Sequence, residues 1–350
     1  MKLEPVAAAL GRRSGVRHVI VHTGQHYDPE MSDAIFRDLG LPRPDVDLEV
    51  GSASHAQQTA TIMQRFESVL IEADPDLVLV YGDVNSTVAA ALVAAKLGVR
   101  VGHVEAGLRS RDWSMPEEIN RVVTDRLSDL LFAPSRDAVA NLLAEGVPAE
   151  RIHFVGNVMI DSLVRLLPDA RRREPWKGLG VSERGYVLVT LHRPSNVDDP
   201  GTFREILGAL EDLANCHPVL FPVHPRTRAR MAGLPWTPRG AGVHLLDPVS
   251  YIDMLGLTAG AGLVVTDSGG VQEETSFLGV PCLTVRPNTE RPITCAEGTN
   301  RLVRSERAAI LAAADQHWGR FAGGPCAIER WDGHTGDRIA RVVCGGERFD

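Results

Sequence analysis

The sequence has few cysteines and no long hydrophobic run. Five cysteines in 350 residues, without any Cys-x-x-Cys spacing, predict neither a disulfide framework nor a metal centre and fit a reducing, cytoplasmic compartment. The longest apolar runs, such as Leu77–Val80 and Gly262–Val265, have the length of a strand and fall far short of the ~20 residues of a membrane span. Glu4 and Pro5 stand where a secretion signal would have apolar residues. The sequence therefore predicts neither a membrane segment nor a secretion signal.

An excess of positive charge is also lacking. The chain carries 37 Lys and Arg residues against 45 Asp and Glu, a formal net charge of −8. Because proteins that bind duplex nucleic acid usually present a basic surface, nucleic acid is not an expected partner. The length of 350 residues, 44% of them hydrophobic, is enough for two domains that each bury a core.

Short apolar runs alternate with amphipathic stretches along the chain, which is typical of βαβ units and parallel sheets. The expected strands of the first half are His18–Thr23, Leu77–Tyr81, Val99–Val104, Leu130–Ala133 and Ile152–Val155. Those of the second half are Tyr186–Leu191, Val219–Val223, Val243–Leu246, Gly262–Thr266 and Cys282–Val285. The expected helices include Gln57–Ala73, Ser86–Lys96, Asp161–Leu167 and Phe203–Ala214. The pattern predicts an α/β protein with two doubly wound, Rossmann-like domains facing each other across a cleft.

The boundary between these domains is expected near Gly156-Asn157, directly after a predicted strand. The Pro- and Arg-rich stretch Pro168–Gly180 then predicts a surface connection. We therefore expect an N-terminal domain over residues 1–157 and a second domain over residues 158–333. Since ligands of such sheets bind outside the carboxyl ends of the strands, the residues that directly follow strands carry most weight.

Acidic residues follow two strands and open one helix in the first half. Asp83 lies between a strand and a helix, where it is either a helix cap or a catalytic group. Glu105 directly ends an apolar strand, so it is either a desolvated acid or base or the ion-pair partner of Arg109. Glu117 and Glu118 follow a proline at a helix start, where the helix dipole alone would favour them. Three acidic positions at one edge of a sheet are more than capping needs.

Histidines end two predicted strands of the second half. His192 and His224 each come at a strand end with an arginine close behind, which is typical of an anion-binding site in which histidine can also move a proton. The alternative for each histidine alone is a structural role. His18, His22 and His26 suggest a metal site, but they straddle a strand and its loop, so an ordinary packed or exposed role is the favoured interpretation.

The strongest phosphate-binding pattern follows the predicted strand 262–266. There Ser268, Gly269 and Gly270 precede a helix, which places bare backbone N–H groups at a helix N-terminus. Glu273 and Glu274 lie one turn further, where a carboxylate can accept hydrogen bonds from ribose hydroxyls. Because the motif is neither a Walker loop nor Gly-x-Gly-x-x-Gly, it favours a nucleoside diphosphate held without a P-loop.

Six motifs occur in order along the chain. They are Gly82-Asp83, His103–Arg109, Pro116–Arg121, Leu191–Arg193, Asp267–Glu274 and Thr289–Pro292. Together they resemble the non-hydrolysing UDP-N-acetylglucosamine 2-epimerases, and the resemblance extends over almost the whole chain.

The resemblance implies a glycosyltransferase-B-like pair of Rossmann domains, assembled as a homodimer. It implies that a C-terminal helix within residues 334–350 packs back onto the first domain. It also implies interconversion of UDP-GlcNAc and UDP-ManNAc without NAD, metal or any other cofactor. The chemistry is an anti elimination of UDP to a 2-acetamidoglucal, followed by re-addition of UDP, and the product feeds surface polysaccharide synthesis.

The resemblance assigns roles to residues motif by motif. Asp83, Glu105 and Glu117 match the acidic residues implicated in catalysis, and either Asp83 or Glu117 is expected to abstract the C2 proton. His192 matches a histidine near the substrate phosphates. The implied substrate-binding residues are Lys2, Met254, Ser268, Gly269, Gly270, Glu274 and Arg291. Of these, the Ser-Gly-Gly element would bind the diphosphate, Glu274 the ribose, and the loop that ends at Met254 the uracil, mainly through its backbone.

The chain departs from the family pattern in two places. Gln25-His26-Tyr27-Asp28 carries Asp28 where members activated by their own substrate have a second Gln, so that activation is not expected. Met1–Pro5 correspond to the family's first helix, and the usual preceding strand, with its phosphate-contacting arginine, is not in this sequence. We expect the N-terminal domain to lack its first strand, and a version extended upstream to be more stable and more active.

Three alternatives share most of these motifs. A 2-epimerase of a modified UDP-diacetamido sugar would have the same UDP-binding residues and a different sugar pocket. A glycosyltransferase of the same fold would keep the Ser-Gly-Gly element but would not need Asp83, Glu105 and Glu117 together. A non-catalytic sugar-nucleotide-binding protein is the third.

Overall fold

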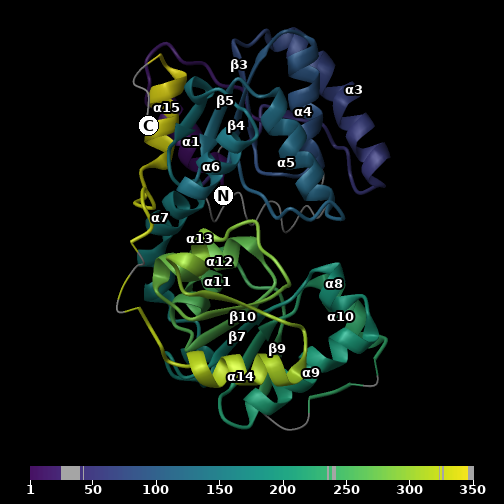
Figure 1. Cartoon of the computed structure of the whole chain (residues 1–350), viewed down its shortest axis with the longest axis vertical. Helices are drawn as coiled ribbons and strands as arrows, with labels where there is room; N and C mark the ends of the chain where they lie inside the picture. Colours follow the sequence, from purple (N-terminus) through teal and green to yellow (C-terminus); the bar gives the residue numbers. More distant parts are fainter. Residues whose placement is uncertain are drawn as a thin grey trace. The chain divides into compact units, whose positions relative to one another are not determined.

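A computed structural model describes residues 1–24, 40–41, 43–234, 236–238, 242–322, 324 and 327–345. The chain divides into two compact units, each an α/β structure (Figure 1). Unit 1 comprises Met1–Ser162 and Glu329–Asp350, and unit 2 comprises Leu163–Ile328. The loop Gln25–Asp28, and with it the question of activation by substrate, lies outside the described residues.

Unit 1 contains a four-stranded parallel sheet with the strand order β3-β4-β5-β6. These strands are β3 (Leu77–Tyr81), β4 (Arg100–Val104), β5 (Leu130–Ala133) and β6 (Ile152–Phe154). A separate parallel pair is formed by β1 (Val21–His22) and β2 (Val46–Asp47). The helices are α1 (Leu3–Gly11), α3 (His55–Ala73), α4 (Asn85–Lys96), α5 (Pro116–Leu127), α6 (Arg136–Ala144), the 3₁₀ turn η1 (Ala149–Arg151) and α15 (Thr335–Val343), while α7 (Val158–Arg173) begins in unit 1 and ends in unit 2.

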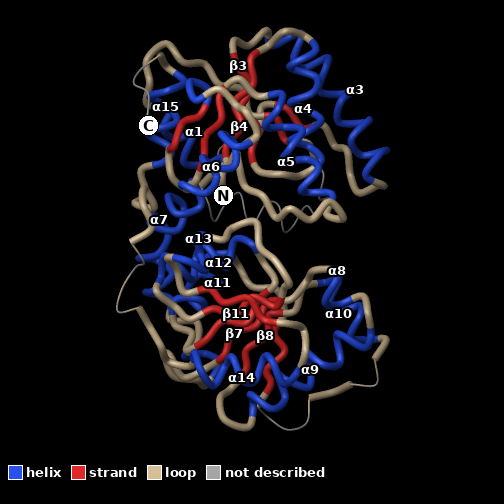
Figure 2. Tube along the Cα trace, in the orientation of Figure 1, coloured by secondary structure: helices blue, strands red, loops and turns tan. Residues whose placement is uncertain are grey.

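Unit 2 contains a six-stranded parallel sheet with the order β12-β11-β10-β7-β8-β9. The strands are β7 (Val187–Thr190), β8 (Val219–Pro222), β9 (Val243–Leu246), β10 (Leu263–Thr266), β11 (Cys282–Val285) and β12 (Asn300–Val303). The helices are η2 (Lys177–Leu179, a 3₁₀ turn), α8 (Pro194–Val197), α9 (Pro200–Ala214), α10 (Pro225–Ala232), α11 (Tyr251–Ala259), α12 (Gly269–Leu278), α13 (Ile293–Ala296) and α14 (Arg307–His317). Figure 2 shows the strands at the centre of each unit with helices around them.

The apolar runs of the sequence are strands whose two faces are both covered. In β7, Val187 and Val189 belong to one hydrophobic cluster, with α9 and α14, whereas Leu188 belongs to the cluster on the other face, with Trp176 and Leu257. Because successive side chains of a strand point to opposite faces, a strand covered on both sides needs an uninterrupted apolar run. The predicted α/β class with parallel sheets is confirmed.

The C-terminal helix α15 packs onto α1 within unit 1. Ile339 and Ala340 share a buried cluster with Val6 and Leu10. At Gly336 an added Cβ would lie 2.5 Å from the carbonyl oxygen of Pro5, so the two helices approach each other too closely for any side chain at this position.

Some elements differ from the expectations. The stretch Pro168–Gly180 was expected to be a connection, but α7 continues through Pro168 to Arg173. Buried Leu166 and Ala170 on either side of the proline anchor this part of the helix, and their burial outweighs the lost backbone hydrogen bond. The sequence also did not reveal β2 and β12, since β2 has two residues and β12 carries two exposed side chains. No helix in the described part of the chain is long and apolar enough to cross a membrane.

Candidate active site

The carboxyl ends of β3 and β4 bring Asp83 and Glu105 to the same edge of the sheet in unit 1. Tyr81 pairs with Val104, the last residue of β4, so the segments that follow leave the sheet side by side. The Gly82 N–H donates to the Val104 carbonyl at 3.0 Å, with Gly82 at φ +67°. Glu105 itself has φ +78°, a conformation that costs a non-glycine residue free energy and occurs preferentially at functional sites.

The Glu105 carboxylate is buried and forms an ion pair with the ammonium of Lys2 at the start of α1. An added Cβ at Gly82 would lie 2.8 Å from Lys2 Nζ, which places this ammonium directly against the turn that carries Asp83. The structure thus brings together three predicted site residues, Lys2, Asp83 and Glu105. It does not bear out the alternative Glu105–Arg109 ion pair, because Arg109 instead pairs with Asp125 and Glu145.

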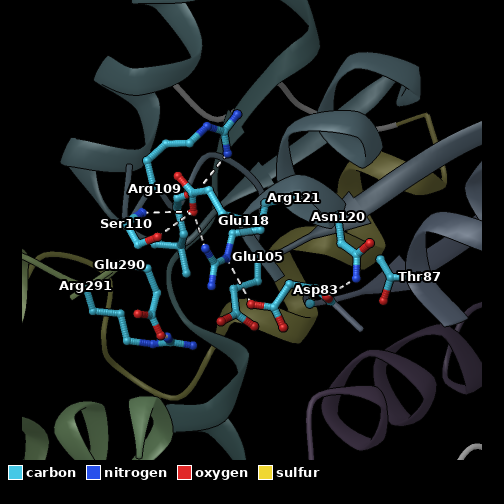
Figure 3. A network of polar contacts seen from close by, with 12 residues as sticks. Asp83, Thr87, Glu105, Arg109, Ser110, Glu118, Asn120, Arg121, Glu290 and Arg291 are labelled. Atoms are coloured by element: carbon cyan, nitrogen blue, oxygen red, sulfur yellow. Dashed lines mark hydrogen bonds and ion pairs between the residues drawn. The ribbon is translucent and has the colours of Figure 1, made fainter. Parts of the chain in front are cut away.

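Residues of α5 hold Asp83 in place, and its side chain remains 24% exposed. Arg121 Nε donates to Asp83 Oδ2 at 2.9 Å, and the amide of Asn120 donates to the Asp83 backbone carbonyl at 2.9 Å (Figure 3). A fixed, partly exposed carboxylate is the geometry that a general base requires.

The two glutamates at the start of α5 differ in environment. Glu118 is buried, pairs with Arg121, and accepts hydrogen bonds from the backbone N–H groups of Ser110 at 2.9 Å and Arg111 at 2.7 Å. Glu117 is half-buried, and its carboxylate forms no hydrogen bond or ion pair within the described chain. Glu118 therefore holds the preceding loop onto α5, and Glu117 is the carboxylate that remains available for a ligand.

In unit 2, α12 begins directly after β10 with Gly269. The first N–H groups of a helix have no acceptor within the helix, and they attract anions. An added Cβ at Gly269 would lie 2.6 Å from Arg291 Nη1 and 2.8 Å from Glu290 Oε1, so the Arg291 guanidinium lies against this helix start. Its Nε is 2.7 Å from Glu273 Oε1, and Nη1 pairs with Glu290. Backbone donors and a fixed cation thus gather beside Ser268, Gly269 and Gly270.

His192, after β7, is held by the buried Asp267 of the neighbouring strand end. Asp267 Oδ1 is 2.9 Å from His192 Nδ1, and the same carboxylate accepts backbone N–H groups of His192 and Arg193 at 2.9–3.1 Å. Burial opposes the charge of Asp267 most strongly, but the hydrogen bond and charge of His192 and the surrounding N–H donors leave its pKa below the usual value. Since Nδ1 faces Asp267, Nε2 of the 44% exposed ring is left for a ligand.

Glu274, one turn into α12, is buried and accepts a hydrogen bond from the Tyr251 hydroxyl at 2.8 Å. Burial, together with the charge of neighbouring Glu273, raises the pKa of Glu274 to about 7, although the Tyr251 hydrogen bond acts in the opposite direction. Met254 lies on α11, one turn after Tyr251. Its half-buried side chain packs on the hydrophobic cluster of this face of the sheet. A ligand bound nearby would therefore contact the start of α11 and not this side chain.

Of the three histidines that suggested a metal site, His22 has an ordinary ion-pair partner. His22 Nδ1 is 3.0 Å from Asp47 Oδ2, an exposed pair across β1 and β2. Over the described ranges, no three His, Cys, Asp or Glu side chains gather closely enough to hold a metal ion. His26 lies outside these ranges.

A family model described as UDP-N-acetylglucosamine 2-epimerase matches residues 8–344 of the chain. The chain belongs to the UDP-N-acetylglucosamine 2-epimerase family. A UDP-N-acetylglucosamine 2-epimerase of Methanococcus maripaludis is 38% identical over 362 aligned positions, which cover 99% of this chain and 96% of that protein. A UDP-2,3-diacetamido-2,3-dideoxy-D-glucuronate 2-epimerase of Pseudomonas aeruginosa is 43% identical over 325 positions, which cover 91% of this chain and 89% of that protein.

Solved structures of the family have the same fold. The UDP-GlcNAc 2-epimerase of Methanocaldococcus jannaschii, in complex with UDP-GlcNAc and UDP, matches with a TM-score of 0.91 and 38% identity, covering 99% of this chain and 96% of that chain. The UDP-GlcNAc 2-epimerase of Neisseria meningitidis bound to UDP-GlcNAc matches with a TM-score of 0.89 and 31% identity, at 99% and 96% coverage. The resemblance inferred from six motifs is thereby confirmed.

Four residues that hold predicted site residues were not singled out in the sequence. Arg121 orients Asp83, Asp267 orients His192, Tyr251 hydrogen-bonds Glu274, and Glu290 clamps Arg291. Each lies within a quoted motif or directly beside a predicted ligand. The sequence signal that could have found them is a charged or polar residue at the buried end of a strand or helix. Such a group needs a hydrogen-bonding or charged partner, because burying it alone costs free energy.

Proposed function

We propose that the protein catalyses reversible epimerisation at C2 of UDP-N-acetylglucosamine to UDP-N-acetylmannosamine. In the forward direction a carboxylate removes the C2 proton while the C1–O bond to UDP breaks, giving 2-acetamidoglucal with a C1=C2 double bond. UDP then re-adds at C1, and a proton is delivered to the opposite face of C2. Atoms balance without any external co-reactant.

In this proposal the two units divide the work. The start of α12, Arg291 and His192 bind and stabilise the diphosphate as it takes up the negative charge of the leaving group. Glu274 accepts hydrogen bonds from the ribose hydroxyls, and the segment that ends at Met254, one turn into α11, adjoins the base. Asp83 and Glu117 are the candidates for proton transfer at C2, and Glu105 with Lys2 sets the charge beside them.

The observation that carries this function is the pair of carboxylates, Asp83 and Glu105, held at adjacent strand ends by Arg121 and Lys2. A glycosyltransferase or a sugar-nucleotide-binding protein would need only the anion site of unit 2. A fixed and partly exposed carboxylate such as Asp83, with the buried charge of Glu105 beside it, is instead what removal of a weakly acidic C–H bond demands.

The test is an incubation with UDP-GlcNAc in D₂O, followed by NMR and chromatography. We expect deuterium to enter at C2 while UDP-ManNAc accumulates. If neither UDP-ManNAc nor C2 deuterium appears, the epimerase proposal is wrong. Hydrolysis or sugar transfer to an acceptor in place of exchange would favour the glycosyltransferase alternative.

A second candidate substrate is a UDP-2,3-diacetamido-2,3-dideoxy-glucuronate. The observation that favours it is the 43% identity to the Pseudomonas aeruginosa enzyme named for this substrate, above the 38% to the Methanococcus maripaludis enzyme. Turnover of both UDP-sugars under one set of conditions decides between them. If kcat/KM is at least tenfold higher for the diacetamido sugar, that sugar replaces UDP-GlcNAc as the proposed substrate.

We also propose that the protein works as a homodimer in the cytoplasm and supplies a sugar nucleotide for surface polysaccharide synthesis. The support is the resemblance to family members. Sedimentation equilibrium should give twice the mass of one chain, and a single-chain mass at micromolar concentration would contradict the dimer.

The raised pKa of Glu274 predicts that substrate binding depends on pH. With this pKa at about 7, the carboxyl is mostly protonated below pH 7 and mostly ionised above it. The ionised form accepts stronger hydrogen bonds from the ribose hydroxyls than the protonated form does, so KM for UDP-GlcNAc should fall roughly fivefold between about pH 6 and about pH 8. Steady-state kinetics across this range check the effect.

Glu274→Gln is the matched control, because glutamine keeps the shape and does not titrate. In this variant the fall in KM should disappear. If KM of Glu274→Gln falls with rising pH as much as KM of the wild type does, another group causes the pH effect.

A further inference from the structure

His103 lies on β4, two residues before Glu105, and is fully buried. Both of its ring nitrogens have close polar partners. Nδ1 is 2.6 Å from Asp125 Oδ1 on α5, and Nε2 is 2.8 Å from the backbone carbonyl oxygen of Gly82. The ring therefore connects a buried carboxylate to the turn that carries Asp83.

Both partners of His103 are hydrogen-bond acceptors. A carbonyl oxygen cannot donate, so Nε2 must carry a hydrogen. Asp125 is ionised because it forms a buried ion pair with Arg109, whose guanidinium is always charged. Asp125 Oδ2 also receives the Gly107 N–H at 3.0 Å and lies 2.7 Å from Arg109 Nη1. An ionised acceptor at Nδ1 requires a hydrogen there as well, so the geometry assigns His103 as an imidazolium.

The charges around this ring balance. Asp125 pairs with His103 on one side and with Arg109 on the other, and Arg109 in turn binds both oxygens of Glu145 at 2.7 and 2.8 Å. Two cations and two anions thus form a continuous chain from the buried β4 to the surface. Such a chain satisfies each buried charge, which an isolated imidazolium would not allow.

This chain holds both carboxylate-bearing turns of unit 1. The Gly82 carbonyl belongs to the same planar peptide group as the Asp83 N–H, so the bond from His103 Nε2 fixes the orientation of the peptide that precedes Asp83. At the other end, Asp125 fixes Gly107, which closes the turn begun by Glu105. Gly82 and Gly107 have φ +67° and +85°, values that glycine adopts as readily as negative ones, so the bonds from His103 and Asp125 select one conformation of two flexible residues.

We propose that His103 is a positioning residue, a buried imidazolium that sets the place of Asp83 relative to Glu105 through the Gly82 carbonyl, with Asp125 as its anchor. The proposal rests on the proposed epimerase function for its kinetic consequence. Its geometric content, the doubly protonated ring, does not depend on that function.

Two single variants of His103 each keep one of its two hydrogen bonds and remove the other. The amide nitrogen of Asn can replace Nδ1 and keep the bond to Asp125, whereas that of Gln can replace Nε2 and keep the bond to Gly82. We expect His103→Asn to lower kcat and the rate of C2 deuterium exchange roughly thirtyfold, since a small misplacement of a catalytic group has effects of this order. His103→Gln should stay within about threefold of the wild type, and the Kd for UDP should stay within about twofold in both.

The matched control is Glu72→Gln, an exposed glutamate of α3 outside this chain of charges, and it should leave kcat unchanged. Thermal melting of all variants separates lost stability from misplaced groups. If His103→Asn and His103→Gln lose kcat equally, or neither loses it, the positioning role is wrong.

An NMR measurement keeps the proposal testable whatever the activity. In ¹⁵N-histidine-labelled wild type at neutral pH, the ring resonances missing from His103→Asn should show protons on both nitrogens. A single protonated nitrogen overturns the assignment. If the wild type exchanges no deuterium at C2 but this signature is present, the epimerase proposal fails while the imidazolium stands.

Discussion

Replacing Asp83 with Asn should lower kcat about a thousandfold or more and abolish deuterium exchange at C2, with UDP binding unchanged within about twofold. Asn has nearly the shape of Asp, and its Oδ1 can still accept the hydrogen bond that Arg121 Nε now donates to Asp83 Oδ2 at 2.9 Å. What Asn lacks is the ability to take a proton. The loss should therefore appear in the chemical step and not in folding or in nucleotide binding.

The D₂O exchange assay, single-turnover kinetics and UDP titration calorimetry check this result. Asp76→Asn is the matched control, because Asp76 is an exposed aspartate that precedes β3 at its opposite end. Full exchange activity in Asp83→Asn would remove Asp83 from proton transfer and leave Glu117 as the candidate base. Reduced UDP affinity in the same variant would instead give Asp83 a part in binding.

The bounds of β3, β5, β9 and β11 agree with the predicted ranges to the residue. β5 and β11 are mostly or fully buried, and a parallel strand covered on both faces requires a continuous apolar run. β3 and β9 are mostly half-buried, and their mainly apolar runs were predictable because Asp and Gly flank them on both sides. β12 carries buried Asn300 and exposed Leu302, so its pattern is not that of a covered strand. Its place in the sheet is given by pairing with β11, a long-range contact that local sequence does not encode.

Site residues were predictable by position and less so by role. A carboxylate at a strand end is visible in the sequence, and Asp83 and Glu105 were found in this way. Glu117 and Glu118 cannot be told apart locally, because adjacent residues of a helix differ mainly in which way they face, and tertiary packing decides which one is buried. The partner of a buried charge, such as Asp267 beneath His192, is likewise visible only after strands far apart in the chain are paired.

The start of α12 is the second place where one substitution should have a large effect. Arg291 cannot simply move away from a side chain added at Gly269, because Glu273 and Glu290 hold its guanidinium and all three groups are buried. Moving it would break charged hydrogen bonds worth about 1.5–3 kcal/mol each. The same displacement would push the cation away from the helix N-terminus that is proposed to bind the diphosphate.

Gly269→Ala should therefore weaken UDP binding by roughly a hundredfold, which corresponds to about 3 kcal/mol, and raise KM for UDP-GlcNAc in parallel. The exchange rate at saturating substrate should fall less, since the carboxylates of unit 1 are untouched. Gly178→Ala is the matched control, because an added Cβ there has no neighbour within 4 Å. UDP titration calorimetry on both variants, with melting curves to confirm folding, measures the effect. UDP affinity equal to that of the wild type in Gly269→Ala would mean that the diphosphate binds elsewhere than the start of α12.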